Sequence, residues 1–137
     1  MDPTASDGAK PVFVITHGAS RPEAYRTLSR RLREERGPRC ESCERIEHRV
    51  ICHHVLEYAL HPPFRCEPGN ILVLCDRCHG KATAAERFPQ DQALYYSRLP
   101  LAIRQRTREF LTQHAPQQHM LLSALARGYD YWLARYP

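Results

Sequence analysis

The sequence predicts an α+β protein in which a small β-hairpin is flanked by helices on both sides. Three observations support this class. Two short segments, at 47–55 and 71–75, contain β-branched residues and have the length of strands. The chain before and after them repeats apolar residues at helical spacing. Two Cys-x-x-Cys pairs, Cys40/Cys43 and Cys75/Cys78, lie close to the two predicted strands.

Length and composition limit the class of protein. A chain of 137 residues corresponds to one domain, with room for an extension. It contains no apolar run near the roughly 18 residues that a membrane span needs, and its start lacks the pattern of a signal peptide. The x-x spacing of the cysteines favours metal binding over disulfides. We therefore expect a cytoplasmic protein without a membrane segment.

The first predicted elements are an arm over residues 1–20, with a short strand at 11–16, and a helix. Ser20 is expected to cap this helix, which should end near Arg36 because Gly37-Pro38 follows. One apolar stripe marks its buried face: Tyr25, Leu28 and Leu32.

The hairpin follows the first Cys pair. Its strands at 47–55 and 71–75 are joined by a loop that Pro and Gly keep irregular. A helix at 76–88 comes next, with His79 in its first turn. The 31 residues between Cys43 and Cys75 exceed the roughly 15–20 between the knuckles of a simple zinc ribbon, and a hairpin accounts for that length.

Residues 89–137 are predicted to be helical. A short helix should precede Pro100, which either kinks it or begins a second helix that runs to about His114. An amphipathic run should follow Pro116. The apolar stripe of that run contains Leu121, Leu125, Trp132 and Tyr136. We expect this stripe to pack on the first helix or on the hairpin unit. The alternative is a homodimer or protein-partner surface through these C-terminal helices, because Tyr and Trp favour interfaces.

The order of these residues resembles a known family. Cys-x-x-Cys, then His53-His54, then Asn70-Ile-Leu-Val-Leu-Cys-x-x-Cys-His79 is similar to the motif of the HNH endonucleases, which have a ββα-metal fold. The resemblance covers roughly Arg21 to Phe88. It implies an HNH nuclease domain at 21–88, between the arm at 1–20 and a helical extension at 89–137.

The resemblance also implies a role for each motif residue. The four cysteines would hold a structural zinc ion, in the tetrahedral thiolate arrangement that zinc prefers. His54 would be the general base, and His53 and His79 would bind a catalytic Mg²⁺, Mn²⁺ or other divalent cation. Asn70 would orient the His54 ring. Because neighbouring side chains on a strand point to opposite faces, both histidines should reach one phosphate only if the strand twists or bulges.

The distribution of charge suggests a polyanionic partner, most simply double-stranded DNA. The net charge is +5, and the basic excess lies in residues 1–39 and 89–137, whereas residues 40–88 carry one more acid than base. The alternative is that these arginines merely solvate helix faces. The side chains we expect to contact nucleic acid are Arg26, Arg30, Arg33, Arg77 and Lys81.

Two other functions also fit the sequence. One is a non-catalytic, zinc-stabilised module of the same fold that binds nucleic acid or serves as an adaptor. The other is cleavage of RNA, since nothing in the sequence distinguishes the sugar. The presence of His54, Asn70 and His79 together favours the nuclease. Cys52 and Cys66 are expected to be small buried side chains outside the metal site.

Overall fold

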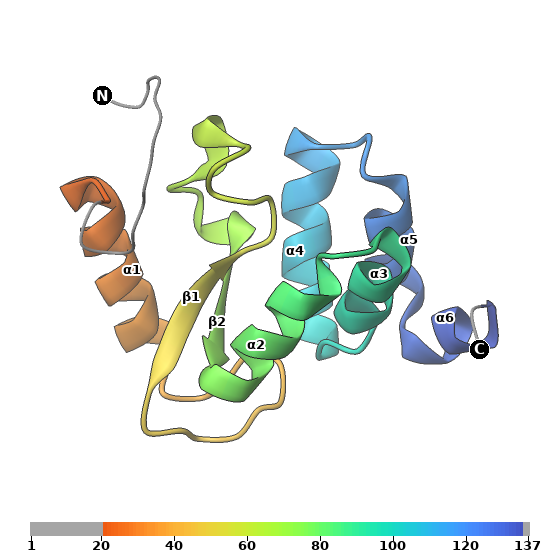
Figure 1. Cartoon of the computed structure of the whole chain (residues 1–137), viewed down its shortest axis with the longest axis horizontal. Coiled ribbons are helices and arrows are strands. Elements are labelled where there is room, and N and C mark those ends of the chain that lie inside the picture. Colours follow the sequence, from red (N-terminus) through yellow and green to blue (C-terminus); the bar gives the residue numbers. More distant parts are fainter. Residues whose placement is uncertain (1–20, 136–137) are drawn as a thin grey trace.

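The computed structural model describes residues 21–135, so the strand expected at 11–16, Ser20 and Tyr136 lie outside the described residues. Within that range the chain forms six α-helices and one two-stranded antiparallel sheet (Figure 1). The α+β class is therefore confirmed. Helix α1 lies on one side of the hairpin, and α3 to α6 lie on the other.

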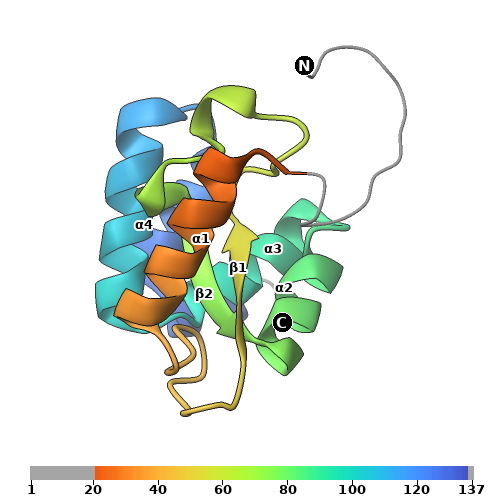
Figure 2. The same cartoon turned by 90° about the vertical axis from the view of Figure 1, so that its left-hand side faces the viewer.

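Helix α1 spans Glu23–Arg36 and buries Tyr25, Leu28 and Leu32, as the apolar stripe predicted. Its N-cap position is held by Pro22 without a side-chain hydrogen bond. The helix ends at Gly37, where an added Cβ would come within 2.8 Å of a Val50 methyl carbon and 2.5 Å of the Arg33 carbonyl oxygen. This close approach seats α1 across the sheet (Figure 2).

Strand β1 spans Val50–His54 and strand β2 spans Ile71–Cys75. They pair in continuous antiparallel register from Val50 opposite Cys75 to His54 opposite Ile71. The bounds of β2 are as predicted. The first strand is shorter than 47–55 because β2 offers only five residues to pair with before the chain turns into the next helix.

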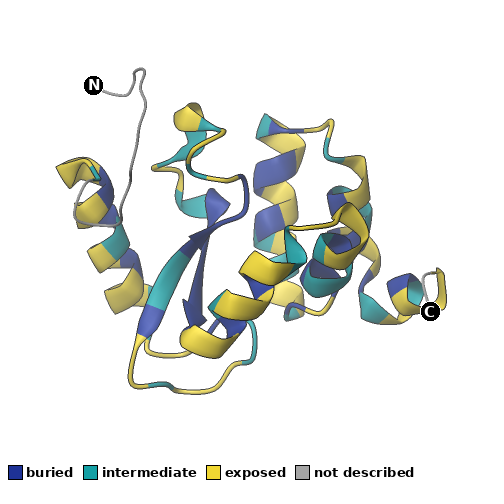
Figure 3. Ribbon diagram, in the orientation of Figure 1, coloured by how far each residue is buried: buried dark blue, intermediate teal, exposed yellow. Residues whose placement is uncertain are grey.

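Each face of the sheet is covered by different elements. On one face, Ile71 and Val73 join the apolar stripe of α1. On the other, Leu72 and Leu74 enter a larger core shared with the C-terminal helices. Every residue of β2 is buried, which agrees with a continuous apolar run rather than an alternating one (Figure 3).

Helix α2, Asp76–Ala85, begins directly after β2. It was expected to reach residue 88 but ends three residues earlier. The cause is Pro89, which starts the next helix and holds Phe88 in an extended conformation. The loop before β2 contains two single 3₁₀ turns, at Pro62–Phe64 and Pro68–Asn70.

The C-terminal part consists of α3 (Pro89–Ser97), α4 (Leu101–His114), α5 (His119–Arg127) and α6 (Tyr129–Arg135). The last run is two helices because Gly128 has a φ of 87° and interrupts it.

Helix α5 packs on α3 and α4. Its Leu121 and Leu125 share a core with Leu72 and Leu74, so this stripe packs on the hairpin unit. None of the described helices has the length and apolar character needed to cross a membrane.

Candidate functional site

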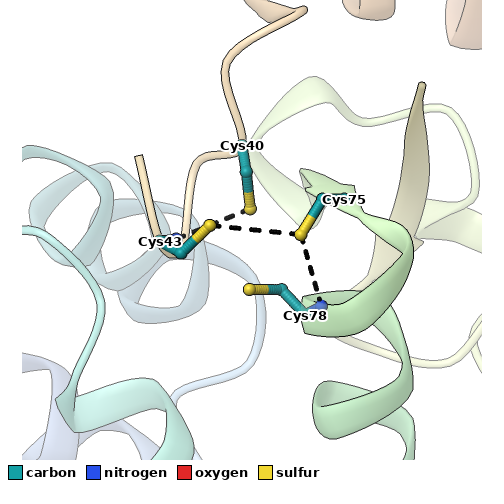
Figure 4. Close-up of side chains that lie close together, drawn as sticks. All are labelled: Cys40, Cys43, Cys75 and Cys78. Atoms are coloured by element: carbon teal, nitrogen blue, oxygen red, sulfur yellow. Dashed lines mark hydrogen bonds between the residues drawn. The ribbon is translucent and has the colours of Figure 1, made fainter. Parts of the chain in front are cut away.

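Four cysteines from separate elements converge on one point. Cys40 and Cys43 lie in the loop after α1, Cys75 ends β2, and Cys78 lies in the first turn of α2. Their sulfur atoms all lie within 4.8 Å of one another (Figure 4), and the Cys43 and Cys75 sulfurs are 4.0 Å apart. Tetrahedral zinc with Zn–S bonds of about 2.3 Å separates its sulfurs by about 3.8 Å. The cluster therefore fits a zinc ion.

Backbone groups and burial shape this cluster. The amide of Cys43 donates to the Cys40 sulfur at 3.5 Å, and the amide of Cys78 donates to the Cys75 sulfur at 3.5 Å. Burial, followed by the neighbouring thiols, raises the pKa of Cys78 to about 12. Four thiolates cannot share this space without a compensating cation, which is what a bound metal would supply.

Glu41 connects the loop from Cys40 to Cys43, the first knuckle, to the rest of the protein. Its carboxylate is 8% exposed and accepts from the two Nη atoms of Arg106 at 2.7 and 2.9 Å. The same carboxylate accepts from the Val73 amide at 2.9 Å, and the Glu41 amide donates to the Val73 carbonyl at 2.8 Å. Arg36 of α1 lies 3.7 Å away. This cluster, which we call the Glu41 cluster, joins the knuckle, α1, α4 and the outer edge of β2.

A groove of about 560 Å³ runs between α1 and α2 across the outer edge of β1. His53, His54 and His79 all line it. The two neighbouring histidines point to opposite faces, but β1 is an edge strand, so side chains from both faces can reach a groove that passes around that edge. We expected a twist or a bulge at this point, and the continuous register of the strand pair shows that β1 has no bulge.

His54 is buried among aromatic rings at the α1 side of the groove. Its ring centre lies 5.2 Å from those of Tyr25 and Tyr58. Its Nε2 lies 2.9 Å from the carbonyl oxygen of Arg65. Since a carbonyl can only accept, the neutral ring carries its proton on Nε2 and its lone pair on Nδ1. Burial is the main cause that lowers the pKa of His54 to about 4, so the ring is neutral near pH 7.

His53 and His79 meet at the α2 side of the groove. Their ring centres are 5.3 Å apart, and His53 is 6% exposed. Burial, and next the neighbouring His53, lower the pKa of His79 below its ordinary value, which favours the neutral ring that binds metals. Glu86, at the end of α2, places Oε2 3.2 Å from the Nε2 of His53. These imidazoles are suitable ligands for one divalent ion.

Asn70 does not have the contact that we expected. Its side chain is fully buried; Oδ1 accepts from the Leu56 amide at 2.7 Å, and Nδ2 donates to the carbonyls of Leu56 at 3.1 Å and Phe64 at 3.0 Å. Because Asn70 enters β2 opposite Val55, its amide reaches the loop backbone rather than the His54 ring. The group that orients His54 is the Arg65 carbonyl instead.

The cations around the groove differ from those predicted. Of the five expected nucleic-acid contacts, Arg33 lines the groove. The other four are exposed but are not among the residues that line it: Arg26, Arg30, Arg77 and Lys81. Arg21 and Arg49 do line it and were missed. The signal for Arg21 was present, because it continues the four-residue spacing of Tyr25, Ser29 and Arg33, which lie on one face of α1, to a position just before the helix begins.

The remaining cysteines are free and lie apart from the four-cysteine cluster. Cys52 is half-buried, and the Ser29 hydroxyl donates to its sulfur at 3.4 Å. Cys66 is exposed, so its expected burial is wrong. It belongs to the loop before β2, where Pro62 and Pro68 keep the backbone at the surface.

Comparisons of the chain with protein-family models, with curated proteins and with solved structures found no match. The resemblance to HNH endonucleases therefore depends on the motif residues themselves.

Proposed function

We propose that this chain is a metal-dependent HNH endonuclease that hydrolyses phosphodiester bonds in DNA, with His54 as the general base. The observation that carries the proposal is the state of His54. The ring lines an open groove, the Arg65 carbonyl holds its proton on Nε2, and its lowered pKa leaves Nδ1 able to accept a proton at neutral pH.

The lining of the groove suits a phosphodiester backbone. Arg21, Arg33 and Arg49 contribute three guanidinium groups, which bind phosphate oxygens through paired N–H donors. An anionic phosphate near His54 would also stabilise its protonated form. The pKa of the ring would then rise toward neutral pH when substrate is bound, which makes it a more effective base.

The proposed reaction divides the work between the two sides of the groove. His54 takes a proton from water at Nδ1, and the resulting hydroxide attacks phosphorus while the bond to the leaving oxygen breaks. His53 and His79 would hold a divalent cation on the other side. When bound, that cation supplies Lewis acidity and neutralises the charge that develops on the phosphate and the leaving oxygen. The Arg65 carbonyl stabilises the imidazolium that forms on His54.

The test is cleavage of supercoiled, linear and single-stranded DNA by the zinc-loaded protein, with Mg²⁺ or Mn²⁺ titrated. His54→Ala removes the proton acceptor, so the rate at saturating metal should fall by about 10²- to 10⁴-fold. His53→Ala removes a ligand, so its loss should be relieved in part by more metal. His48→Ala is the matched control, because His48 is exposed and is not among the groove-lining residues.

The outcomes separate the competing functions. If excess metal restores cleavage by His54→Ala but not by His53→Ala, then His53 is the general base and His54 is the metal ligand. If wild type binds DNA but cleaves none of the three forms with any metal, the non-catalytic zinc module is the better account. A parallel assay with an RNA substrate shows whether the chain cleaves DNA or RNA. Cleavage of RNA alone would make the chain a ribonuclease.

A further inference from the structure

The Nε2 atom of His53 is buried without a proper hydrogen bond. Among the described residues it has no partner of acceptable geometry, although Oε2 of Glu86 lies only 3.2 Å away. If this nitrogen carries its lone pair, it faces a carboxylate oxygen and the two repel. If it carries a proton, the hydrogen bond is misaligned. A cation bound by both atoms, with the ring proton on Nδ1, would remove the conflict.

The spacing of these atoms fits a shared ion. Two donors about 2.1 Å from one metal, at angles between octahedral and tetrahedral, lie about 3.0–3.4 Å apart, and the observed separation of Nε2 and Oε2 is 3.2 Å. Imidazole rings on one ion stand roughly 5 Å apart, because each ring centre lies about 3 Å from the metal. The ring centres of His53 and His79 are 5.3 Å apart.

Helix α2 presents the third donor on the correct side. His79, Thr83 and Glu86 follow at intervals of four and three residues, so they share one helix face, and all three line the groove. Glu86 is 18% exposed and sits where α2 ends. Its carboxylate is thus directed toward the β1 edge strand, across from His54.

We propose that Glu86 is the third protein ligand of the metal at His53 and His79, which makes a two-histidine, one-carboxylate site. This rests on the proposed metal-dependent cleavage and specifies its metal centre. Imidazole donors favour first-row transition metals, whereas Mg²⁺ prefers oxygen ligands. The site should therefore take Mn²⁺ in preference to Mg²⁺, with its remaining positions open to water and phosphate.

The experiment measures Mn²⁺ binding, not activity. Free Mn²⁺ is followed by electron paramagnetic resonance during titration of zinc-loaded protein, since Mn²⁺ does not compete for thiolates. Glu86→Gln keeps the size of the side chain and should weaken Mn²⁺ affinity at least about tenfold. Glu57→Gln is the matched control, because it removes the same charge from the same groove but leaves the three donors intact. It should change affinity less than about threefold.

Pulsed resonance of the wild-type complex gives a test that needs no variant, and it should detect two coordinated imidazole nitrogens. Equal affinities for Glu86→Gln and wild type, equal losses for Glu86→Gln and Glu57→Gln, or no Mn²⁺ binding by wild type would each overturn the proposal. If wild type cleaves DNA and Glu86→Gln binds Mn²⁺ as wild type does, Glu86 is not a ligand but the proposed nuclease activity stands. If Mn²⁺ binding depends on Glu86 but wild type cleaves no DNA, the ligand role stands and the proposed nuclease activity is refuted.

Discussion

The buried ion pair between Glu41 and Arg106 should contribute more to stability than an exposed pair, and a double-mutant cycle can measure the difference. The perturbation is Glu41→Gln, Arg106→Met and the two combined. Glutamine keeps an oxygen for the Val73 amide, which donates to Glu41 at 2.9 Å, so the variant mainly loses charge. Methionine keeps the aliphatic part of Arg106 and removes its guanidinium.

The expected loss of stability in each variant follows from the burial of the two side chains. Removing one partner of a buried pair costs about 3–5 kcal/mol because the other charge is left unpaired. Here the side chain of Arg106 is 28% exposed and that of Glu41 is 8% exposed, so water reaches one partner. Arg36 also stays within 3.7 Å of Glu41 when Arg106 is truncated. We therefore expect about 2–3 kcal/mol for each single variant and a coupling energy of about 2 kcal/mol.

The assay is urea denaturation of the zinc-loaded variants, followed by circular dichroism. The reference cycle uses Arg31 and Glu35, whose side chains are 56% and 59% exposed in an i,i+4 pair. That pair should give about 0.3–0.5 kcal/mol. A Glu41–Arg106 coupling as small as the reference would refute the reasoning, because it would mean that solvent screens the buried pair as well as the exposed one.

Four further predictions test the metal, the loop, the groove and the pH dependence. Cys75→Ser should give an unfolded or insoluble protein, and metal analysis of wild type should find about one tightly held zinc per chain; a folded zinc-free wild type would contradict this. Asn70→Ala should lower unfolding stability by about 2–4 kcal/mol in urea denaturation, because the buried Leu56 and Phe64 backbone groups lose their partner. Replacing Arg21, Arg33 and Arg49 with glutamine should flatten the salt dependence of DNA binding more than the same change at Arg26, Arg30 and Lys81, and equal slopes would show that the groove is not the binding surface. Burial holds the pKa of His54 at about 4, so the unfolded chain binds the extra proton first as the pH falls below about 6.5. Between pH 7 and pH 4, the free energy of unfolding of wild type should therefore fall by up to roughly 3 kcal/mol relative to that of His54→Gln. Release of zinc in acid affects both proteins, so it cancels in this difference.

The sequence predicts elements well where one local rule decides them. Strand β2 was bounded correctly because four consecutive apolar residues, all buried, lead into Cys75 of the four-cysteine cluster, and the next helix begins directly after it. The stripe of α1 was correct because its three apolar residues pack on the adjacent sheet face. The spacing of the two Cys-x-x-Cys pairs predicted the cluster because two such pairs can share one ion in only a few arrangements.

The predictions failed where a partner comes from a distant segment. Glu41 lies between two cysteines, and no partner was predicted for it because Arg106, which pairs with it, comes 65 residues later. Asn70 was assigned to His54, but the loop that it closes brings the Leu56 backbone nearer. Glu86 carried a usable signal, because it follows His79 by seven residues on a helix. That signal has meaning only once His53 is known to face α2 rather than α1.

The two edges of the sheet explain why the candidate site lies where it does. On β2, Glu41 pairs with both backbone groups of Val73, and Arg36 and Arg106 donate to the Ile71 carbonyl, so that edge is closed. The edge of β1 opens into the groove instead. Helix α2 links the two regions, because Cys78 of the four-cysteine cluster and His79 of the groove are consecutive residues in its first turn. If the cluster holds zinc, its removal should therefore displace His79, and binding of the proposed second metal in the groove should depend on the first.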